Sequence, residues 1–384
     1  MSTLKVNKIE NTATSDGGIA IDSTGHVQLD GVQLPTVGQL SNRNLIINGS
    51  MQVAQRGTST ASVTSSGYHA ADRFHADVTT AGTWTFSQST TSPDEFANSF
   101  KLDCTTAKAS PDAGTILIFN QRVEGFNLQS LKKGTSAAES VTLSFWVRSS
   151  KTGTYIAELR DNDNSRAISK TYSISSANTW EHKTVTFPGD TTGAFGNDNG
   201  LSLYINWWLA AGSNFTSGTL STSWASITNA NRAVGVVNLA DSTDNEWYIT
   251  GIQLEVGEKA TPFEYRSFGD ELAKCQRYYQ QSYAGASATG SNDGAITASC
   301  VGNVNRAFGN VFWANTMRAA PTVTWYSGST GTSAKWRNHS DGADITAAAP
   351  VLAIGISGYG FVLSAGISAI TDTLFAHYDA DAEL

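Results

Sequence analysis

The sequence predicts an all-β protein, in which an antiparallel β-sandwich is followed by a smaller β domain. Charged residues make up 15% of the chain, well below the usual figure of about 25%. The polar surface relies instead on Ser, Thr and Asn with 35 Gly, a mixture that suits strands joined by tight turns. Apolar residues recur at every second position in many segments, which is the period of a half-buried strand. The length of 384 residues favours two or three folded units.

Charge and cysteine content exclude several classes of function. The formal net charge is −8, and no basic stripe of the kind that neutralises phosphates is present, so nucleic acid is not an expected partner. We expect no export leader of the Sec type, because residues 1–5 run directly into alternating polar residues. Cys104, Cys275 and Cys300 are odd in number and lack CxxC spacing, which favours reduced thiols and synthesis in a reducing cytosol. No cofactor and no metal site are expected.

Residues 1–41, called the lead below, are an N-terminal segment with short apolar stretches separated by glycines. Examples are Ile19 with Ile21 and Val27 with Leu29. These pieces have the size of hairpin strands, and none buries enough surface to be stable alone. The lead is therefore expected to order against another copy of the chain or a partner protein.

Residues 42–268 carry longer alternating strands, of which 141–147 and 201–207 are clear examples, with loops rich in Gly, Asn, Asp and Ser. This pattern predicts the antiparallel sandwich. Residues 269–283 break it with a short helical connector, for which Asp270 is the expected N-cap.

Residues 284–384 return to alternating strands and are expected to form a smaller β-sandwich domain at the tip. The apolar stretch 347–370 has about the length of a membrane span. Pro350 and four glycines interrupt it, so we expect a buried hairpin that turns near 357–360, without membrane insertion. The apolar content of 352–363, with Trp313, Trp325 and Phe375, exceeds what so small a domain buries alone, which predicts that subunit contacts cover the surplus.

Several strings of the sequence resemble known proteins. Residues 44–51 and 247–266 resemble the first and closing strands of jelly rolls of the carbohydrate-binding-module type. Residues 270–279, 317–323 and 380–384, together with the opening string 2–9, are similar to segments of fibres from tailed bacteriophages, particularly phages of marine and photosynthetic bacteria. The resemblance covers nearly the whole chain.

The resemblance implies a trimeric tail-fibre receptor-binding protein of the virion, made in the host cytoplasm, which is not an enzyme. Its lead, residues 1–41, would attach to tail or adaptor proteins, and the homotrimer would recognise a host surface glycan or envelope protein. Many related jelly rolls hold calcium through acidic residues of the first and last strands. Gln52 and Gly251 stand at those places here, so we do not carry this site over.

Two alternative functions are a surface-glycan hydrolase and a purely architectural fibre or capsid decoration. Glycoside hydrolysis needs two carboxyl groups across a sugar. The nominal candidates are Asp161 with Asp163, and Asp241 with Asp244 and Glu246, in the strings RDNDNSR and DSTDNE. Both strings are typical of turns in which Asp and Asn side chains cap the backbone, so catalysis is not expected.

The candidate glycan-binding residues are Trp336, Arg337, Asn338, His339 and Asp341, a polar string with one tryptophan between strands of the terminal domain. Indole stacks on sugar rings while polar neighbours bind the hydroxyls. An exposed binding loop at the tip and a subunit-packing loop both fit this string.

Most other tryptophans are expected in the core. Trp84, Trp146 and Trp247 lie within predicted strands. Trp207 and Trp208 are adjacent in one strand and so face opposite sides of the sheet. We therefore expect one of these two to lie outward or at an interface.

Overall fold

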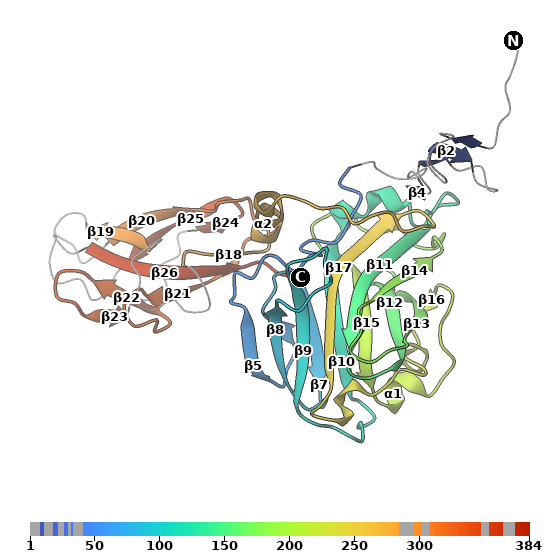
Figure 1. Ribbon diagram of the computed structural model, residues 1–384. Coiled ribbons are helices and arrows are strands. Elements are labelled where there is room, and N and C mark those ends of the chain that lie inside the picture. Colours follow the sequence, from blue (N-terminus) through green and yellow to red (C-terminus); the bar gives the residue numbers. More distant parts are fainter. Residues whose placement is uncertain are drawn as a thin grey trace, which may run out of the picture.

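The computed structural model describes residues 8–10, 18–21, 27–29, 32–33, 41–283, 295–300, 307–346, 353–363 and 373–384. These residues are nearly all β, and every strand pairing among them is antiparallel, which confirms the predicted fold class (Figure 1). None of the helices in this part of the chain is long and apolar enough to cross a membrane.

Two sheets form the sandwich. The seven-stranded sheet has the order β16-β13-β12-β15-β10-β7-β6 and the six-stranded sheet the order β14-β11-β17-β9-β8-β5. Strands of the first sheet are β6 (Gly67–Tyr68), β7 (Phe74–Thr79), β10 (Ile116–Glu124), β12 (Gly153–Asp161), β13 (Arg166–Ile174), β15 (Leu201–Ala211) and β16 (Ala225–Ser226). Strands of the second are β5 (Ser59–Val63), β8 (Thr83–Ser89), β9 (Ser99–Thr106), β11 (Val141–Ser149), β14 (Glu181–Phe187) and β17 (Glu246–Val256).

The sandwich core is aromatic. Phe119 of one sheet lies 5.6 Å from Trp247 of the other, and Phe145 lies 5.7 Å from Trp207, measured between ring centroids. The burial predicted for Trp84 and Trp247 is confirmed, since each is 0% exposed, and Trp207 is likewise 0% exposed. Trp146 was also expected in the core, but it is only half-buried. Such ring pairs across two inner faces hold the layers together through burial and edge-to-face contact.

The expectation of an outward or interfacial member of the tryptophan pair was wrong. Trp208 does face away from the sandwich core, yet it is 0% exposed. The segment that contains α1 (Ser213–Thr216) folds back over it, so that Phe215 and Ala233 pack against the indole in a small second core. A loop of the same chain thus covers this face, which strand alternation alone does not reveal.

The start of the sandwich runs along its last strand. Leu45 N–H donates to the Leu254 carbonyl at 2.9 Å, and Ile252 N–H donates to the Gly49 carbonyl at 3.0 Å. Residues 44–51 form no strand of their own. Within β17, Gly251 has a φ of +60°, and a Cβ at this position would lie 2.6 Å from Cζ of Phe96. Only glycine fits this point without strain.

Helix α2 (Phe268–Gln276) follows the sandwich. The expectation that Asp270 caps it was wrong, because the Ser267 hydroxyl oxygen accepts the Asp270 N–H at 3.2 Å. Asp270 instead lies in the first turn, where its negative charge favours the helix dipole.

The C-terminal β unit is one sheet built around β26 (Thr373–Asp381). Its path is β23-β22-β26-β19-β20-β25-β24, and β18 and β21 also pair with β26. The other strands are β18 (Tyr279–Gln281), β19 (Ile296–Cys300), β20 (Ala307–Phe312), β21 (Thr322–Ser327), β22 (Lys335–Asn338), β23 (Asp344–Thr346), β24 (Ala353–Gly355) and β25 (Gly358–Leu363). The predicted hairpin is present, with Gly355 opposite Gly358, while 347–352 and 364–370 lie outside the described residues.

The lead contains a small meander of β1 (Lys8–Glu10), β2 (Gly18–Ile21), β3 (Val27–Leu29) and β4 (Val32–Gln33). Ile19 pairs with Ile9 on one side and Leu29 on the other, as strands of hairpin size. Ile19 and Ile21 are 44% and 46% exposed. The remaining residues of the lead lie outside the described part, and its attachment to a partner stays a prediction.

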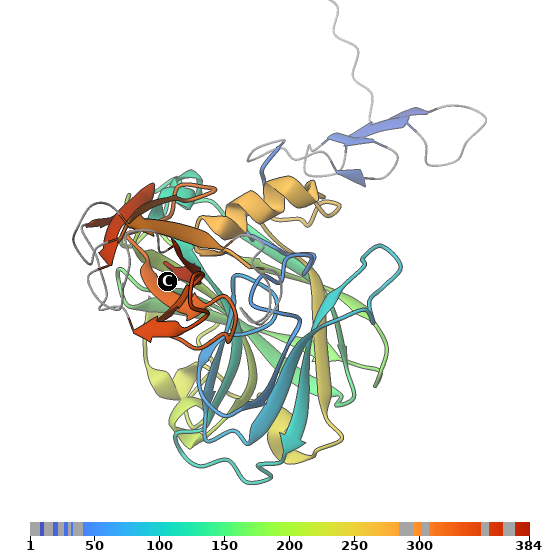
Figure 2. The same ribbon diagram turned by 90° about the vertical axis from the view of Figure 1, so that its left-hand side faces the viewer.

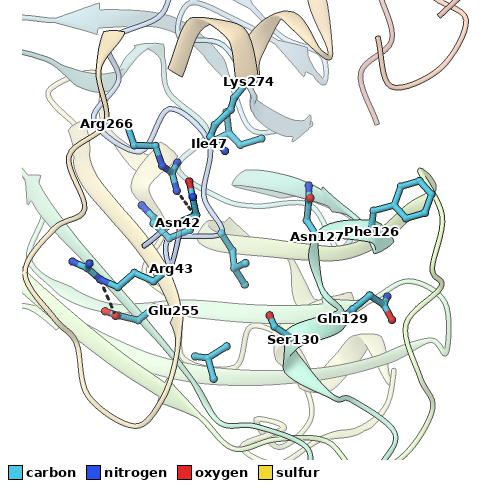
Figure 3. Close-up of a pocket in the computed structure, with 13 residues that line it drawn as sticks. Asn42, Arg43, Ile47, Phe126, Asn127, Gln129, Ser130, Glu255, Arg266 and Lys274 are labelled. Carbon is cyan, nitrogen blue, oxygen red and sulfur yellow. Dashed lines mark hydrogen bonds and ion pairs between the residues drawn. The ribbon is translucent and has the colours of Figure 1, made fainter. Parts of the chain in front are cut away.

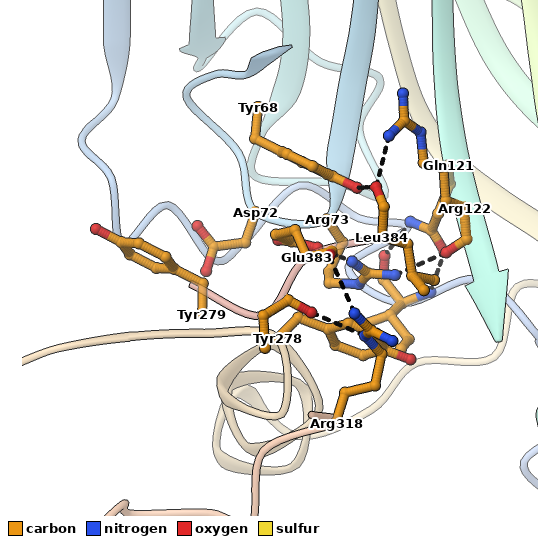
Figure 4. A network of polar contacts seen from close by, with 12 residues as sticks. Tyr68, Asp72, Arg73, Gln121, Arg122, Tyr278, Tyr279, Arg318, Glu383 and Leu384 are labelled. Atoms are coloured by element: carbon orange, nitrogen blue, oxygen red, sulfur yellow. Dashed lines mark hydrogen bonds and ion pairs between the residues drawn. The ribbon is translucent and has the colours of Figure 1, made fainter. Parts of the chain in front are cut away.

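Buried ion pairs join the C-terminal unit to the sandwich (Figure 4). Arg73, which is 1% exposed, donates to the carboxylate of Glu383, whose side chain is 4% exposed. Arg56 contacts the same carboxylate at 3.3 Å. The Arg73 guanidinium also lies 3.4 Å above the ring of Tyr278. A charge so far from water requires such partners.

The chain end and the end of helix α2 add further contacts to this interface. The main-chain oxygen of Leu384 accepts from the Tyr68 hydroxyl at 3.0 Å and from Arg122 at 2.5 Å. On the helix side, Arg277 forms a bidentate pair with Glu124 at 2.8 Å for both bonds, and the Tyr278 hydroxyl donates to Glu124 at 2.9 Å. The two views of the ribbon show the C-terminal unit beside one end of the sandwich (Figures 1 and 2).

Candidate ligand-binding pocket

A cavity of about 380 Å³ lies where the first segment of the sandwich, the end of β17, the turns after β10 and helix α2 meet (Figure 3). This volume falls in the range of about 300–1,000 Å³ that ligand sites occupy. Its lining combines polar and basic side chains with four apolar ones: Asn42, Arg43, Asn44, Leu45, Ile47, Phe126, Asn127, Gln129, Ser130, Glu255, Val256, Arg266 and Lys274.

The two arginines of the lining hold the pocket together. Arg43 lies 3.6 Å from the Glu255 carboxylate and donates to the Thr261 hydroxyl at 2.8 Å. Arg266 donates to the Ile46 carbonyl at 3.0 Å and pairs with Glu264 at 3.1 Å. Both guanidinium groups are thus used in fixing residues 43–46 against the closing strand.

Glu264 supports the same wall. Its carboxylate accepts the main-chain N–H groups of Asn44 and Arg43 at 3.0 and 3.2 Å. Burial disfavours its ionisation, but these hydrogen bonds and the neighbouring Arg266 outweigh burial and lower the pKa of Glu264. The carboxylate therefore stays charged at neutral pH.

The opposite wall is a turn that presents an exposed aromatic ring. A 3₁₀ turn, Gly125–Asn127, follows β10 directly, and Phe126 is 52% exposed at its centre. Phe126 N–H donates to the Asp198 carbonyl at 2.9 Å. A Cβ on Gly125 would lie 2.2 Å from the Gly196 carbonyl oxygen, so glycine permits this close approach.

Exposed amide and hydroxyl groups flank the ring. Gln129 donates its amide hydrogens to the carbonyls of Gly125 and Gly196 at 2.9 and 2.8 Å, which fixes its orientation. Asn127 and Ser130 are exposed beside it. The half-buried Lys274 comes from the last turn of α2. A ring with fixed amides, a hydroxyl and an ammonium group suits a ligand that has both apolar faces and many hydroxyls.

The structure places the sequence-predicted glycan residues elsewhere, in the C-terminal unit. Trp336 lies on β22, not in a loop, and is 1% exposed, because its ring packs 5.2 Å from Trp325 and 5.1 Å from Phe361. Asn338 is also buried. The exposed tryptophan that sugar stacking requires is therefore missing from this string.

The other three residues of the string remain accessible. Arg337 pairs with Asp344 at 3.3 Å and is half-buried, while His339 and Asp341 are exposed in the turn after β22. Their part in glycan binding stays a prediction.

The carboxylates considered for hydrolysis are engaged in structural contacts. Asp161 is 0% exposed and lies 2.6 Å from the Lys133 ammonium. Asp163 accepts the Gly196 N–H at 2.8 Å. Asp241 pairs with Lys151, and Glu246 pairs with Lys101 at 2.7 Å. Asp244 accepts from the Ser242 hydroxyl at 3.3 Å. Each of these carboxylates thus has a structural contact.

The two positions considered for calcium carry no carboxylate. Gly251 occupies the strained point in β17, and the main-chain oxygen of Gln52 accepts from the Gln88 amide at 3.2 Å. Among the described residues, no three His, Cys, Asp or Glu side chains are grouped so as to hold a metal ion.

Sequence reasoning did not select Phe126, Gln129 or Lys274. One local signal was present, since Phe126 stands alone among glycine and polar residues directly after a strand. Its pocket partners come from segments 42–47, 255–256 and 266–274, which only the fold brings together.

No family model matches the chain, and no curated protein matches it. Similar solved structures include the enzymatically active domain of bacteriophage CBA120 tailspike protein 4, at 18% identity and a TM-score of 0.29, covering 56% of this chain and 22% of that one. A putative sugar binding protein from Bacteroides thetaiotaomicron has 12% identity and a TM-score of 0.32, with 56% and 100% covered. The CBM22-1 xylan-binding domain from Paenibacillus barcinonensis has 11% identity and a TM-score of 0.26, with 59% and 100% covered.

These sequence identities and TM-scores are too low to indicate a function. The sheet order of the chain itself defines its class as an antiparallel β-sandwich. The solved structures with which it shares this likeness include a phage tailspike domain and several carbohydrate-binding modules. The chain spans only 22% of the length of the tailspike domain.

Proposed function

We propose that the chain is the receptor-binding protein of a phage tail fibre, and that it recognises a host cell-surface glycan through the pocket of Figure 3. The observation that carries the proposal is the exposed ring of Phe126 beside the fixed amide of Gln129, at the outer edge of a cavity of about 380 Å³ with a polar and basic wall (Figure 3). Sugars combine apolar ring faces with hydroxyls, and this wall offers a partner for each. The resemblance to phage fibres supports the viral setting.

In this proposal the protein is a homotrimer in the virion, and residues 1–41 attach it to tail or adaptor proteins. Three weak glycan sites on one fibre raise avidity by about 10² to 10⁴ without a tight single site. The function requires no catalysis, because binding alone places the particle on its host. An envelope protein as receptor would use the same surface.

Competition with phage adsorption tests the proposal. Purified protein should block adsorption to a susceptible bacterium, and Phe126→Ala should lose most of this effect, because stacking on an aromatic ring is removed. Phe268→Ala is the matched control, since Phe268 is 55% exposed and lies outside the pocket lining. Unchanged adsorption at saturating wild-type protein would contradict the proposal.

Two further measurements separate the alternatives. Release of new reducing ends from envelope polysaccharide would indicate a hydrolase, and its absence over a broad pH range agrees with a binding protein. Failure of labelled protein to bind cells at all would favour an architectural fibre. Light scattering measures the mass that a trimer requires.

A further inference from the structure

We propose that the pocket selects an acidic glycan, one that carries a carboxylate or sulfate on the sugar that enters the cavity. This inference rests on the proposed glycan-binding function and adds the class of ligand. The group that carries it is the ammonium of Lys274, which lines the same cavity as Phe126 (Figure 3).

Lys274 differs from the other cations of the lining. Arg43 is held by Glu255 and Thr261, and Arg266 is held by Glu264 and by main-chain carbonyls. Among the described residues, no carboxylate pairs with Lys274 and no hydrogen bond uses its ammonium. A half-buried ammonium at the wall of a cavity is therefore free to bind an anion.

The carboxylates near the pocket are engaged by other groups, and none of them forms an ion pair with Lys274. Glu255, whose side chain is 2% exposed, accepts the Thr261 N–H and the Gln253 amide, both at 2.8 Å. Glu271 accepts the Asn48 N–H at 2.5 Å and lies 3.6 Å from Arg266.

The charges of the lining itself are three cations and one carboxylate, Glu255. The chain as a whole has a formal net charge of −8. Glu264 and Glu271, which are outside the lining, pair with Arg266, so Lys274 is the cation of the lining that has no carboxylate partner among the described residues.

The contribution of Lys274 to ligand affinity depends on how exposed its side chain is. A solvent-exposed ion pair contributes little to binding, whereas a hydrogen bond to a partly buried charged group changes the dissociation constant about tenfold or more. Because Lys274 is half-buried, we take the lower value of about tenfold. Such a contribution should weaken as salt concentration rises.

The experiment uses the full chain and three probes: polygalacturonate with carboxylates, dextran sulfate with sulfates, and neutral dextran. At low salt, the wild-type protein should bind an anionic probe more tightly than dextran. Lys274→Gln should weaken that binding about tenfold, and Lys274→Arg should largely retain it because the charge remains. The first two probes distinguish the carboxylate from the sulfate as the recognised group.

A matched control removes a charge elsewhere. Lys108→Gln lies outside the lining, and its ammonium pairs with Asp112 at 2.8 Å on the surface. This variant should bind the anionic probes as the wild type does. An equal loss in both variants would assign the effect to overall charge and overturn the inference.

The remaining outcomes distinguish failure of the acidic-ligand inference from failure of the proposed glycan-binding function. Loss of probe binding in Phe126→Ala but not in Lys274→Gln would overturn the acidic ligand and leave a neutral glycan site. Equal binding of dextran and both anionic probes would do the same. Failure of all three probes to bind, together with unimpaired adsorption in the competition assay, would overturn both proposals.

Discussion

Removing the negative charge of Glu383 should detach the C-terminal β unit from the sandwich. In Glu383→Gln, the Arg73 guanidinium keeps its charge at 1% exposure but loses its carboxylate partner. Tyr278 still covers it with a ring 3.4 Å away, and the Arg122 carbonyl still accepts from it at 2.7 Å. Neither contact supplies a negative charge.

The magnitude follows from the burial of both partners. Breaking a fully buried ion pair on one side costs about 3–5 kcal/mol, mainly because the remaining charge stays out of water. Arg56 is less affected, since it retains Asp381 at 3.2 Å. The double variant Arg73→Met with Glu383→Leu removes both charges, so it should be much closer to the wild type than Glu383→Gln alone.

Urea unfolding followed by intrinsic fluorescence measures this cost, because tryptophans lie in both cores. Glu258→Gln, at an exposed residue, controls for the charge change itself. A loss below about 1 kcal/mol in Glu383→Gln, the value of an exposed pair, would refute the argument that this pair holds the interface.

Three further changes test other parts of the structure. Burial and the Arg122 guanidinium lower the pKa of His75 to about 3, whereas the unfolded chain takes up a proton near about pH 6.5, so this residue should reduce stability by about 2 kcal/mol from about pH 7.5 to 5. His75→Gln should remove this contribution in urea titrations and leave the part of the slope that comes from His69 and His182, whose pKa values burial also lowers. An unchanged slope would contradict the assignment. Gly251→Ala should lower stability by about 2–4 kcal/mol in thermal melts, through left-handed strain and the clash with Phe96, and an unchanged melt would argue against the positive φ. Trp336→Ala should destabilise the C-terminal unit by about 3–5 kcal/mol and leave binding of the polysaccharide probes intact, whereas lost binding with unchanged stability would return the glycan site to this string.

The sandwich could be predicted because its two inner faces impose a period of two on their strands. The alternating segments 141–147 and 201–207 lie in β11 and β15. Their apolar residues face the opposite sheet, and even a short stretch of such a pattern is informative. Strand Lys335–Asn338 has the same two-residue period, because Trp336 and Asn338 are buried and their neighbours are not. Its polar composition nevertheless led to the prediction of a loop.

Strand β26 was not predicted from the sequence, although four other strands of the C-terminal unit pair with it. It carries polar residues at covered positions, and other segments satisfy them. His377 is 0% exposed and contacts the Ser282 hydroxyl at 3.1 Å, and Asp379 accepts from the Tyr326 hydroxyl at 2.7 Å. A buried polar side chain is acceptable once it is paired, but the partner is known only from the fold.

Pocket and interface share two elements, which makes the interface relevant to recognition. Glu124 ends β10 and holds Arg277 and Tyr278 of the interface, and two residues later the same turn presents Phe126 to the pocket. Helix α2 likewise places Lys274 in the pocket and buries the adjacent Cys275 in the interface. Because a nine-residue helix is marginal on its own, its position depends on these tertiary contacts. Loosening the interface in Glu383→Gln should therefore also weaken binding of the anionic probes, whereas unchanged binding would show that Glu124 alone suffices to hold the pocket.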